Sequence, residues 1–188
     1  MSSFNDEDRP ADSQDFIQES LFDIGPGDEV GYRVPIACQV AGITYRQLDY
    51  WARTDLVKPS IRNARGSGSQ RLYSFRDILV LKIVKRLLDT GISLQNIRLA
   101  VDSLRNRGVN DMAEITLVSD GTTVYECRSA EEVIDLLGGG QGVFGIAVPG
   151  IMKELTGTIA SFPSERIDAD DHVVSLDDLA ARRARRSS

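Results

Sequence analysis

The stretch TYRQLDYWARTDLV, residues 44–57, contains two Arg, two Tyr and the only Trp of the chain. Arginine carries a planar guanidinium whose N–H groups fit phosphate oxygens and the edge of guanine, and the tyrosine hydroxyl is a further hydrogen-bond donor. In a helix of about 3.6 residues per turn, Arg46, Tyr50 and Arg53 fall on one side. Such side chains at this spacing are suited to binding a polyanion.

The charge of the chain is distributed in a way that supports this interpretation. The whole chain carries −6, but residues 33–107 hold fourteen Lys and Arg against five Asp, which gives this segment +9. Residues 1–32 carry −8 and residues 108–188 carry −7. A basic segment inside an acidic chain indicates a domain that binds a polyanion such as a nucleic acid.

The helix that presents these side chains is predicted to begin after Thr44. Thr44 and Gln47 have the spacing of a capping box, in which each side chain satisfies a backbone N–H of the other residue. Trp51 is expected to have a structural role on the opposite side of this helix. The residues expected to pack inward there are Tyr45, Leu48, Trp51 and Ala52.

A helix-turn-helix followed by a hairpin is predicted around this segment. In VPIACQVAGI, Pro35 suits a first helical position and Gly42 ends the helix. Two helices joined by a short turn with Gly form a helix-turn-helix, whose second helix can lie in the major groove of DNA. In KPSIRNARGSGSQRLYS, residues 63–69 have the composition of a turn between the short strands SIR and QRLY. We expect a hairpin with a basic tip, which would act as a wing.

Two further helices are predicted after the hairpin. SFRDILVLKIVKRLLDTG has Ser74 and Asp77 near its start and Gly91 at its end. SLQNIRLAVDSLRNRG has Ser93 as its cap and Gly108 as its stop. Both carry an apolar stripe, so both are expected to pack on the core.

Beyond Gly108 the pattern changes to short strands. In AEITLVSDGTTVYECRSAEEV, residues 115–118 and 122–126 alternate around an Asp-Gly pair, which is a strong hairpin signal. Ser129 and Glu132 form a second capping box at the start of a helix. VFGIAV has the pattern of a strand and IMKELTGTIASF that of a helix, so the order strand-strand-helix-strand-helix is expected.

These elements predict an α+β chain of four parts. They are a disordered acidic leader at 1–30, a winged helix-turn-helix DNA-binding domain at 31–108, a small α/β domain at 111–163 and a flexible tail at 164–188. The DNA-binding domain has the order helix-helix-hairpin-helix-helix. The α/β domain is expected to serve dimerisation or regulation.

Residues 31–107 resemble the DNA-binding domain of the MerR family of bacterial transcription regulators. The resemblance rests on four motifs in order, YRQLDYWARTDLV, Arg71-Leu72-Tyr73, SFRDI and GISLQNIR. It implies a dimer on a pseudo-palindromic operator, with each recognition helix in a major groove and each wing on flanking phosphates.

Two departures from the family pattern qualify the resemblance. The wing ends in Ser69, Gln70 and Arg71, where Gly-Tyr-Arg is usual. No long dimerisation helix follows Gly108, and the chain is most similar to an actinobacterial subgroup with a small globular C-terminal domain. Such a domain can dimerise, sense an effector or contact RNA polymerase, and these alternatives stay open.

The expected DNA contacts lie on the recognition helix and the wing. Arg46 and Arg53 are expected at guanine edges, with Gln47 or Tyr45 secondary, and Tyr50 at a phosphate. Phosphates are assigned to the basic side chains, hydroxyls and amides of the wing. The full set is Thr44, Tyr45, Arg46, Gln47, Tyr50, Arg53, Lys58, Arg62, Arg65, Ser67, Ser69, Gln70 and Arg71.

Other kinds of chemistry find little support. Cys38 and Cys127 belong to no CxxC pair, and the single His172 lies in a polar, acidic stretch, so neither a metal nor a cofactor is expected. GGGQGVFG lacks the Gly-Lys-Ser/Thr of a phosphate-binding loop, and no catalytic triad can be assembled. We therefore expect no enzyme.

The remaining expectations concern location and role. No apolar run is long enough to span a bilayer and the N-terminus is acidic, so the chain is expected in the cytoplasm. The expected partners are double-stranded DNA and a second copy of the chain. The favoured function is a sequence-specific transcriptional regulator, and the alternative is an architectural or excisionase-like accessory protein.

Overall fold

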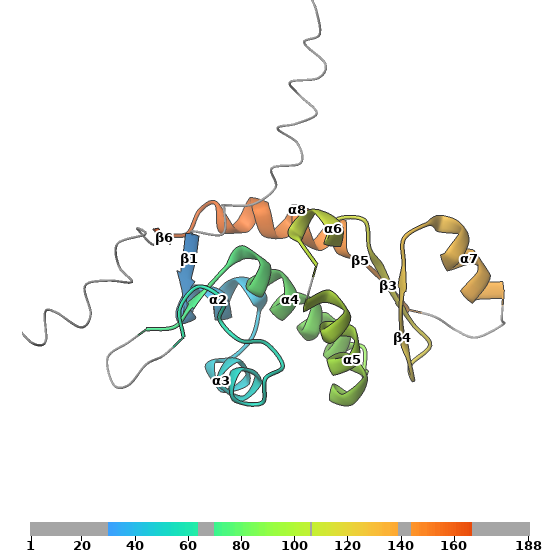
Figure 1. Ribbon diagram of the computed structural model, residues 1–188, viewed down its shortest axis with the longest axis horizontal. Helices are drawn as coiled ribbons and strands as arrows, with labels where there is room; N and C mark the ends of the chain where they lie inside the picture. The colour runs from blue at the N-terminus through green and yellow to red at the C-terminus, as the bar shows by residue number, and fades with distance from the viewer. Residues whose placement is uncertain (1–29, 64–69, 106, 139–143, 167–188) are drawn as a thin grey trace, which may run out of the picture.

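The computed structural model describes residues 30–63, 70–105, 107–138 and 144–166 (Figure 1). In this part of the chain the element order is β1 (Val30–Arg33), α2 (Val34–Ala41), α3 (Tyr45–Arg53), β2 (Leu72–Tyr73), α4 (Phe75–Asp89), α5 (Leu94–Arg105), α6 (Val109–Met112), β3 (Thr116–Ser119), β4 (Val124–Cys127), α7 (Ala130–Gly138), β5 (Phe144–Ala147), α8 (Val148–Ile159) and β6 (Glu165–Arg166). The predicted α+β class is confirmed, as is the order strand-strand-helix-strand-helix in the C-terminal part. None of the helices described is long and apolar enough to cross a membrane.

Local signals place the helix ends. Gly42 ends α2 in the left-handed conformation with φ of 71°, where a side chain would be strained. The capping box of Thr44 and Gln47 starts α3, with Gln47 N donating to Thr44 Oγ1 over 3.2 Å. A second capping box starts α4, where Ser74 N donates to Asp77 Oδ2 over 2.9 Å.

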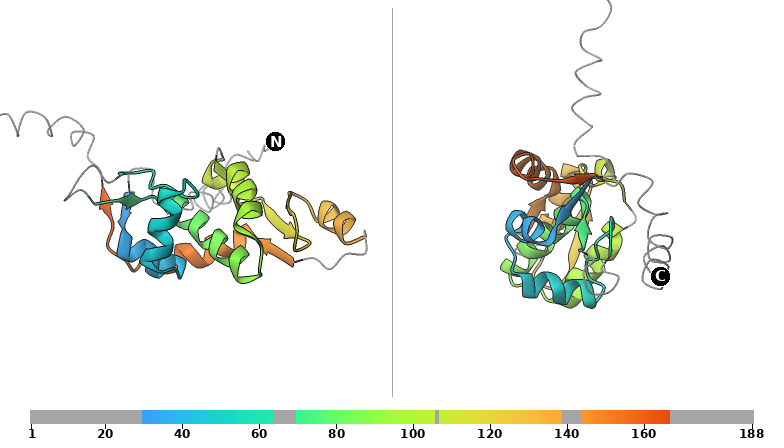
Figure 2. Two further views of the ribbon diagram at one scale, coloured as in Figure 1. Left: turned by 90° about the horizontal axis from the view of Figure 1, so that it is seen from below. Right: turned by 90° about the vertical axis from the view of Figure 1, so that its left-hand side faces the viewer.

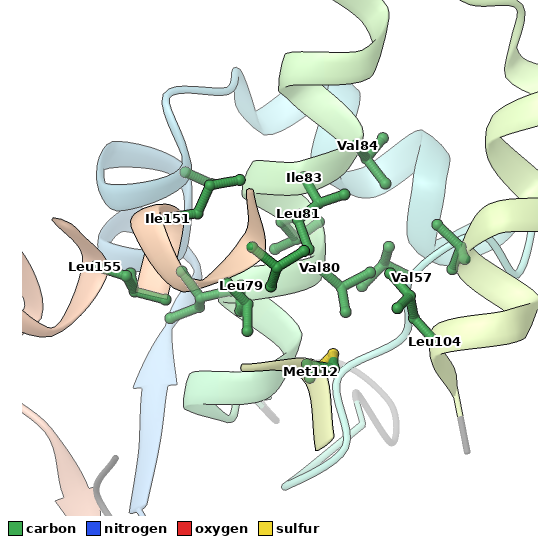
Figure 3. Close-up of a cluster of buried hydrophobic side chains, with 14 of the residues drawn as sticks. Val57, Leu79, Val80, Leu81, Ile83, Val84, Leu104, Met112, Ile151 and Leu155 are labelled. Carbon is green, nitrogen blue, oxygen red and sulfur yellow. The ribbon is translucent and has the colours of Figure 1, made fainter. Parts of the chain in front are cut away.

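Helix α4 lies at the centre of the core and is buried on more than one side. Figure 3 shows Leu79 and Leu81 near Ile151 and Leu155 of α8, while Val80 lies near Val57. The sequence pattern predicted one wide apolar stripe on this helix. In the structure the apolar residues occupy a further side of α4, which carries Leu79 and Leu81 and is covered by α8. The buried apolar residues of α4 are Phe75, Ile78, Leu79, Val80, Leu81, Ile83, Val84 and Leu87.

The hairpin expected after α3 is seen at its base, where Arg62 and Leu72 form a single antiparallel bridge. Arg62 N donates to Leu72 O over 3.2 Å and Leu72 N to Arg62 O over 2.9 Å. The tip, residues 64–69, lies outside the described residues. In addition to this predicted pairing, β2 pairs with β1, in the strand order β2-β1-β6. Gly31 permits this pairing, since a Cβ there would lie 3.0 Å from Leu72 Cβ.

The C-terminal part packs directly on the helix-turn-helix part. Helix α8 contacts α4 and α2, and β6 pairs with β1 although residues 165–166 fall in the range predicted to be a tail. Glu154 of α8 accepts a hydrogen bond from Lys82 over 2.9 Å and also binds Arg86, both on α4. One hydrophobic cluster runs through both parts.

Glu154→Gln is expected to lower the free energy of unfolding by about 0.5–1 kcal/mol at neutral pH, because the ion pair with Lys82 is lost. The loss is small because the Glu154 side chain is 48% exposed and solvent screens the pair. The pKa of Glu154 lies below its ordinary value of 4.5, chiefly because Lys82 donates to the carboxylate. The stabilisation is complete above pH 4.5 and is lost as the pH falls through the lowered pKa. Urea titrations at several pH values measure this. The exposed Glu114→Gln is the control, and an equal loss of stability in both variants would contradict the prediction.

Candidate nucleic-acid interface

Helix α3 presents one side to solvent and packs the other against the core. Leu48 is fully buried and Trp51 is 2% exposed, as the structural role of Trp51 requires. Tyr50 is 46% exposed, and Arg46 is exposed as well. The prediction that Tyr45 packs inward is wrong, because its side chain is 64% exposed. A helical side chain covers the turn that precedes it, and Tyr45 is the first residue of α3, so it has no preceding turn to cover.

Asp49 connects the recognition helix to the root of the wing. Its carboxylate binds Arg71 over 3.0 Å and Arg53 over 3.0 Å. The Asp49 and Arg71 side chains are only 23% and 21% exposed, so this pair is better shielded from solvent than an ordinary surface pair. Asp49 therefore orients two arginines, and it was missed as a site residue even though its spacing to Arg53 allows an ion pair within the helix.

Arginines of α5 hold the segment that follows α3. Arg98 Nη1 donates to Thr54 O over 2.7 Å, and Arg105 donates to the carbonyl oxygen of Asp55. Asp55 has a φ of 61°, the left-handed region that ends the helix. These two arginines satisfy carbonyl groups beyond the helix end, which no local sequence pattern indicates.

The predicted contact residues within the described ranges fall into three groups. Tyr45, Arg46, Tyr50 and Gln70 are exposed, and in the described part of the chain Arg46 forms no ion pair. Arg53 and Lys58 are exposed and Arg62 is half-buried, and they are paired with Asp49, Asp55 and Glu165 respectively. Thr44, Gln47 and Arg71 hold structure through the capping box and Asp49. Arg65, Ser67 and Ser69 lie outside the described residues.

The basic footprint is therefore narrower than the charge of residues 33–107 suggests. Four of the basic side chains pair with acids on α4, α8 and β4, namely Lys82, Lys85, Arg86 and Arg107. Three donate to backbone carbonyl groups, namely Arg76, Arg98 and Arg105. Figures 1 and 2 show α3 on the side of the molecule opposite α8, so its exposed face is clear of the C-terminal helix.

Metal or thiol chemistry has no visible support at this surface. In the ranges that the structure describes, no three His, Cys, Asp or Glu side chains gather to hold a metal. Burial raises the pKa of both Cys38 and Cys127, which keeps the thiols protonated. His172 lies outside these ranges.

Helices α2 and α3 joined at Gly42, with a wing root held to α3 by Asp49 and Arg71, define a winged helix-turn-helix DNA-binding protein. The family model described as MerR HTH family regulatory protein matches residues 32–104. The chain belongs to the MerR family of helix-turn-helix transcriptional regulators, which confirms the resemblance.

Individual relatives agree with this assignment. HTH-type transcriptional regulators of Mycobacterium tuberculosis and Mycobacterium bovis are each 71% identical over 173 residues, which is 90% of this chain and 77% of the relative. The regulator HmrR of Sinorhizobium medicae is 29% identical over 83 residues, which is 43% of this chain and 54% of the relative. The mycobacterial likeness therefore extends into the C-terminal part, whereas the likeness to HmrR covers less than half of the chain.

Thr44→Ala is expected to lower the free energy of unfolding by about 1 kcal/mol, because the capping box at the start of α3 is lost. Thr44→Ser retains the hydroxyl and is the matched control, with a loss of less than half of that. Thermal and urea unfolding of both variants measure the difference. Equal stability of the Ala and Ser variants would show that the cap does not stabilise α3.

Proposed function

We propose that this protein binds a pseudo-palindromic promoter operator in the cytoplasm as a homodimer and thereby regulates transcription. The observation that carries the proposal is the exposed Arg46 face of α3, next to a wing root that Asp49 and Arg71 hold in place. Membership of a family of transcriptional regulators supports this role over that of an enzyme.

Arg46 is the best candidate for reading a base. It is exposed and forms no ion pair within the described ranges, so its guanidinium is available to the O6 and N7 acceptors of guanine. Arg53 lies nearly two turns further on and is pre-oriented by Asp49, which also reduces its net attraction to DNA. Tyr45 and Tyr50 are exposed on the same helix and are suited to backbone phosphates.

Lys58, Arg62 and the wing supply charge. The Lys58 side chain is 54% exposed and that of its partner Asp55 is 63% exposed, whereas Arg62 and its partner Glu165 are half-buried, at 41% and 34%. An exposed pair such as Lys58 with Asp55 is weak, so Lys58 can exchange a carboxylate for a phosphate at little cost. The release of counterions from DNA then contributes affinity that does not depend on sequence.

For the dimer, we propose the exposed face of α7 as the contact between copies. Ile134 is 63% exposed and Leu137 is 48% exposed, and the spacing of three residues puts both on one side of the helix. α7 lies at the end of the molecule away from the wing root (Figure 1). A second copy bound there leaves the α3 face of each copy accessible to DNA.

An architectural protein is the alternative function. The continuous core between the C-terminal part and α4 favours the regulator, because an accessory factor needs little beyond the winged helix. Mapping the bound sites across a genome separates the two: a regulator concentrates at promoters, and an architectural protein spreads or gathers at recombination sites.

Arg46→Ala is expected to weaken binding to the preferred operator by about 1–3 kcal/mol and to relax the preference at one base position. Gel-shift titrations at a fixed salt concentration, with single-base operator variants, measure both effects. Lys153→Ala removes the same charge from α8, on the far side of the molecule, and should change neither. Unchanged affinity and base preference in Arg46→Ala would refute this assignment.

Replacing both Ile134 and Leu137 by Asp is expected to raise the dissociation constant of the dimer by at least about tenfold, because two charges would be buried in an apolar contact. Sedimentation velocity over a range of protein concentrations measures it. The control is Leu99→Asp, which places a charge at another exposed leucine, 68% exposed on α5. A dimer that persists unchanged in the double variant would place the interface elsewhere.

A further inference from the structure

Two adjoining cavities lie where the segment after α3 meets the start of α4 and the end of α5. Their volumes are about 280 Å³ and about 440 Å³. Ser60, Arg76 and Arg105 line both, so we treat the two as one site, the Arg76 cavity. Their combined volume is in the range of sites for small ligands.

Arg76, which lines both cavities, has an unsatisfied donor. Its Nη2 donates to the carbonyl oxygens of Leu104 and Arg105 at the end of α5, over 3.0 Å to Leu104. Its Nε is buried and has no hydrogen-bond partner among the described residues. A buried N–H without a partner is costly, and for a charged group the cost is higher. An acceptor supplied by a ligand would remove this cost.

Arg76 is the lining cation that has no carboxylate partner among the described residues. The other three basic side chains of the lining are paired: Lys58 with Asp55 over 2.9 Å, Arg105 with Asp102 over 3.2 Å and Arg107 with Glu126 over 2.7 Å. Asp77 Oδ2 already accepts from Ser60 N over 2.7 Å, Ser60 Oγ over 2.8 Å and Ser74 N over 2.9 Å. Asp77 therefore holds the wall together and does not pair with Arg76, so the unpaired guanidinium of Arg76 favours an anion.

The other wall of the smaller cavity is apolar. It is formed by Leu56, Val57, Pro59, Val80 and Val101. A bare phosphate gains nothing from this surface, whereas a molecule with a hydrocarbon body removes it from water. A carboxylate on such a body also matches the guanidinium fork of arginine.

We propose that the Arg76 cavity binds a small monocarboxylate with a short apolar body. The carboxylate accepts a hydrogen bond from Arg76 Nε, and the apolar body lies against Val80 and Val101. The ligand then contacts the segment 55–61, which joins the recognition helix to the wing. It also lies beside Arg107, whose guanidinium binds Glu126 of β4 over 2.7 Å.

The test observes the Arg76 Nε–Hε signal by NMR in the full chain, titrated with hexanoate, benzoate or 3-phenylpropionate. A saturable shift of this signal is expected with at least one of them, and none with hexanol. Arg76→Lys keeps the charge but lacks Nε, and should weaken binding about tenfold, as followed by the backbone signals of Val80 and Val101. Arg86→Gln, on the same helix but paired with Glu154, should leave binding unchanged.

Two results would overturn the proposal. One is that none of the three carboxylates shifts the Arg76 Nε–Hε signal. This measurement uses the wild-type protein, so it does not depend on whether a variant folds. The other is an equal response to inorganic phosphate, which would assign the cavity to phosphate instead.

Binding at this cavity is expected to change operator affinity, and this consequence rests on the proposed function. Gel shifts with and without the carboxylate test it for the wild type and Arg76→Lys. If the carboxylate binds and operator affinity stays the same, the cavity is a ligand site without a regulatory role. If operator binding itself is absent, the NMR result still decides whether the site exists.

Discussion

The burial of α4 is the constraint on which the rest of the structure depends. Its apolar side chains occupy several sides, so no single neighbouring helix can cover them. Helices α2 and α5 cover part of this surface, and α8 covers Leu79 and Leu81 (Figure 3). The C-terminal part is thus required to complete the core of the DNA-binding part. This requirement explains why one hydrophobic cluster includes residues from both.

On this core, the position of α3 is determined by a small number of polar contacts. Asp49 binds Arg71 at the wing root, and Arg98 and Arg105 hold carbonyl groups beyond the end of the helix. These contacts are made by arginines that a charge count would assign to DNA. Because they are used within the protein, they hold α3 at Asp49 and beyond its C-terminal end, while Arg46 remains available. Holding a helix in one position lowers the entropy that is lost when DNA binds.

Much of this could be predicted from the sequence wherever the cause is local. The capping boxes at Thr44 and Ser74 and the helix end at Gly42 are defined by neighbours within four residues. The box at Thr44 was predicted as such, Ser74 and Asp77 were predicted near the start of α4, and Gly42 was predicted as a helix end. The pairing of β1 with β2 and β6 could not be predicted, since it joins segments about 40 and 130 residues apart. The same holds for the site: Arg46 follows from helical spacing, whereas the bond between Asp49 and Arg71 depends on how the wing returns to α3.

The shared core also determines how a signal can reach the DNA-binding surface. A MerR regulator with one long dimerisation helix would transmit a change along that helix, but here α8 and β6 lie directly on α4 and β1. Glu154 of α8 binds Lys82 and Arg86 of α4, the helix against which α2 packs. Close-packed interiors have low compressibility and transmit strain, so these contacts connect α8 mechanically to the helix-turn-helix. The physical connection from α8 to α3 therefore runs through packed helices, from α8 to α2 and from α2 to α3.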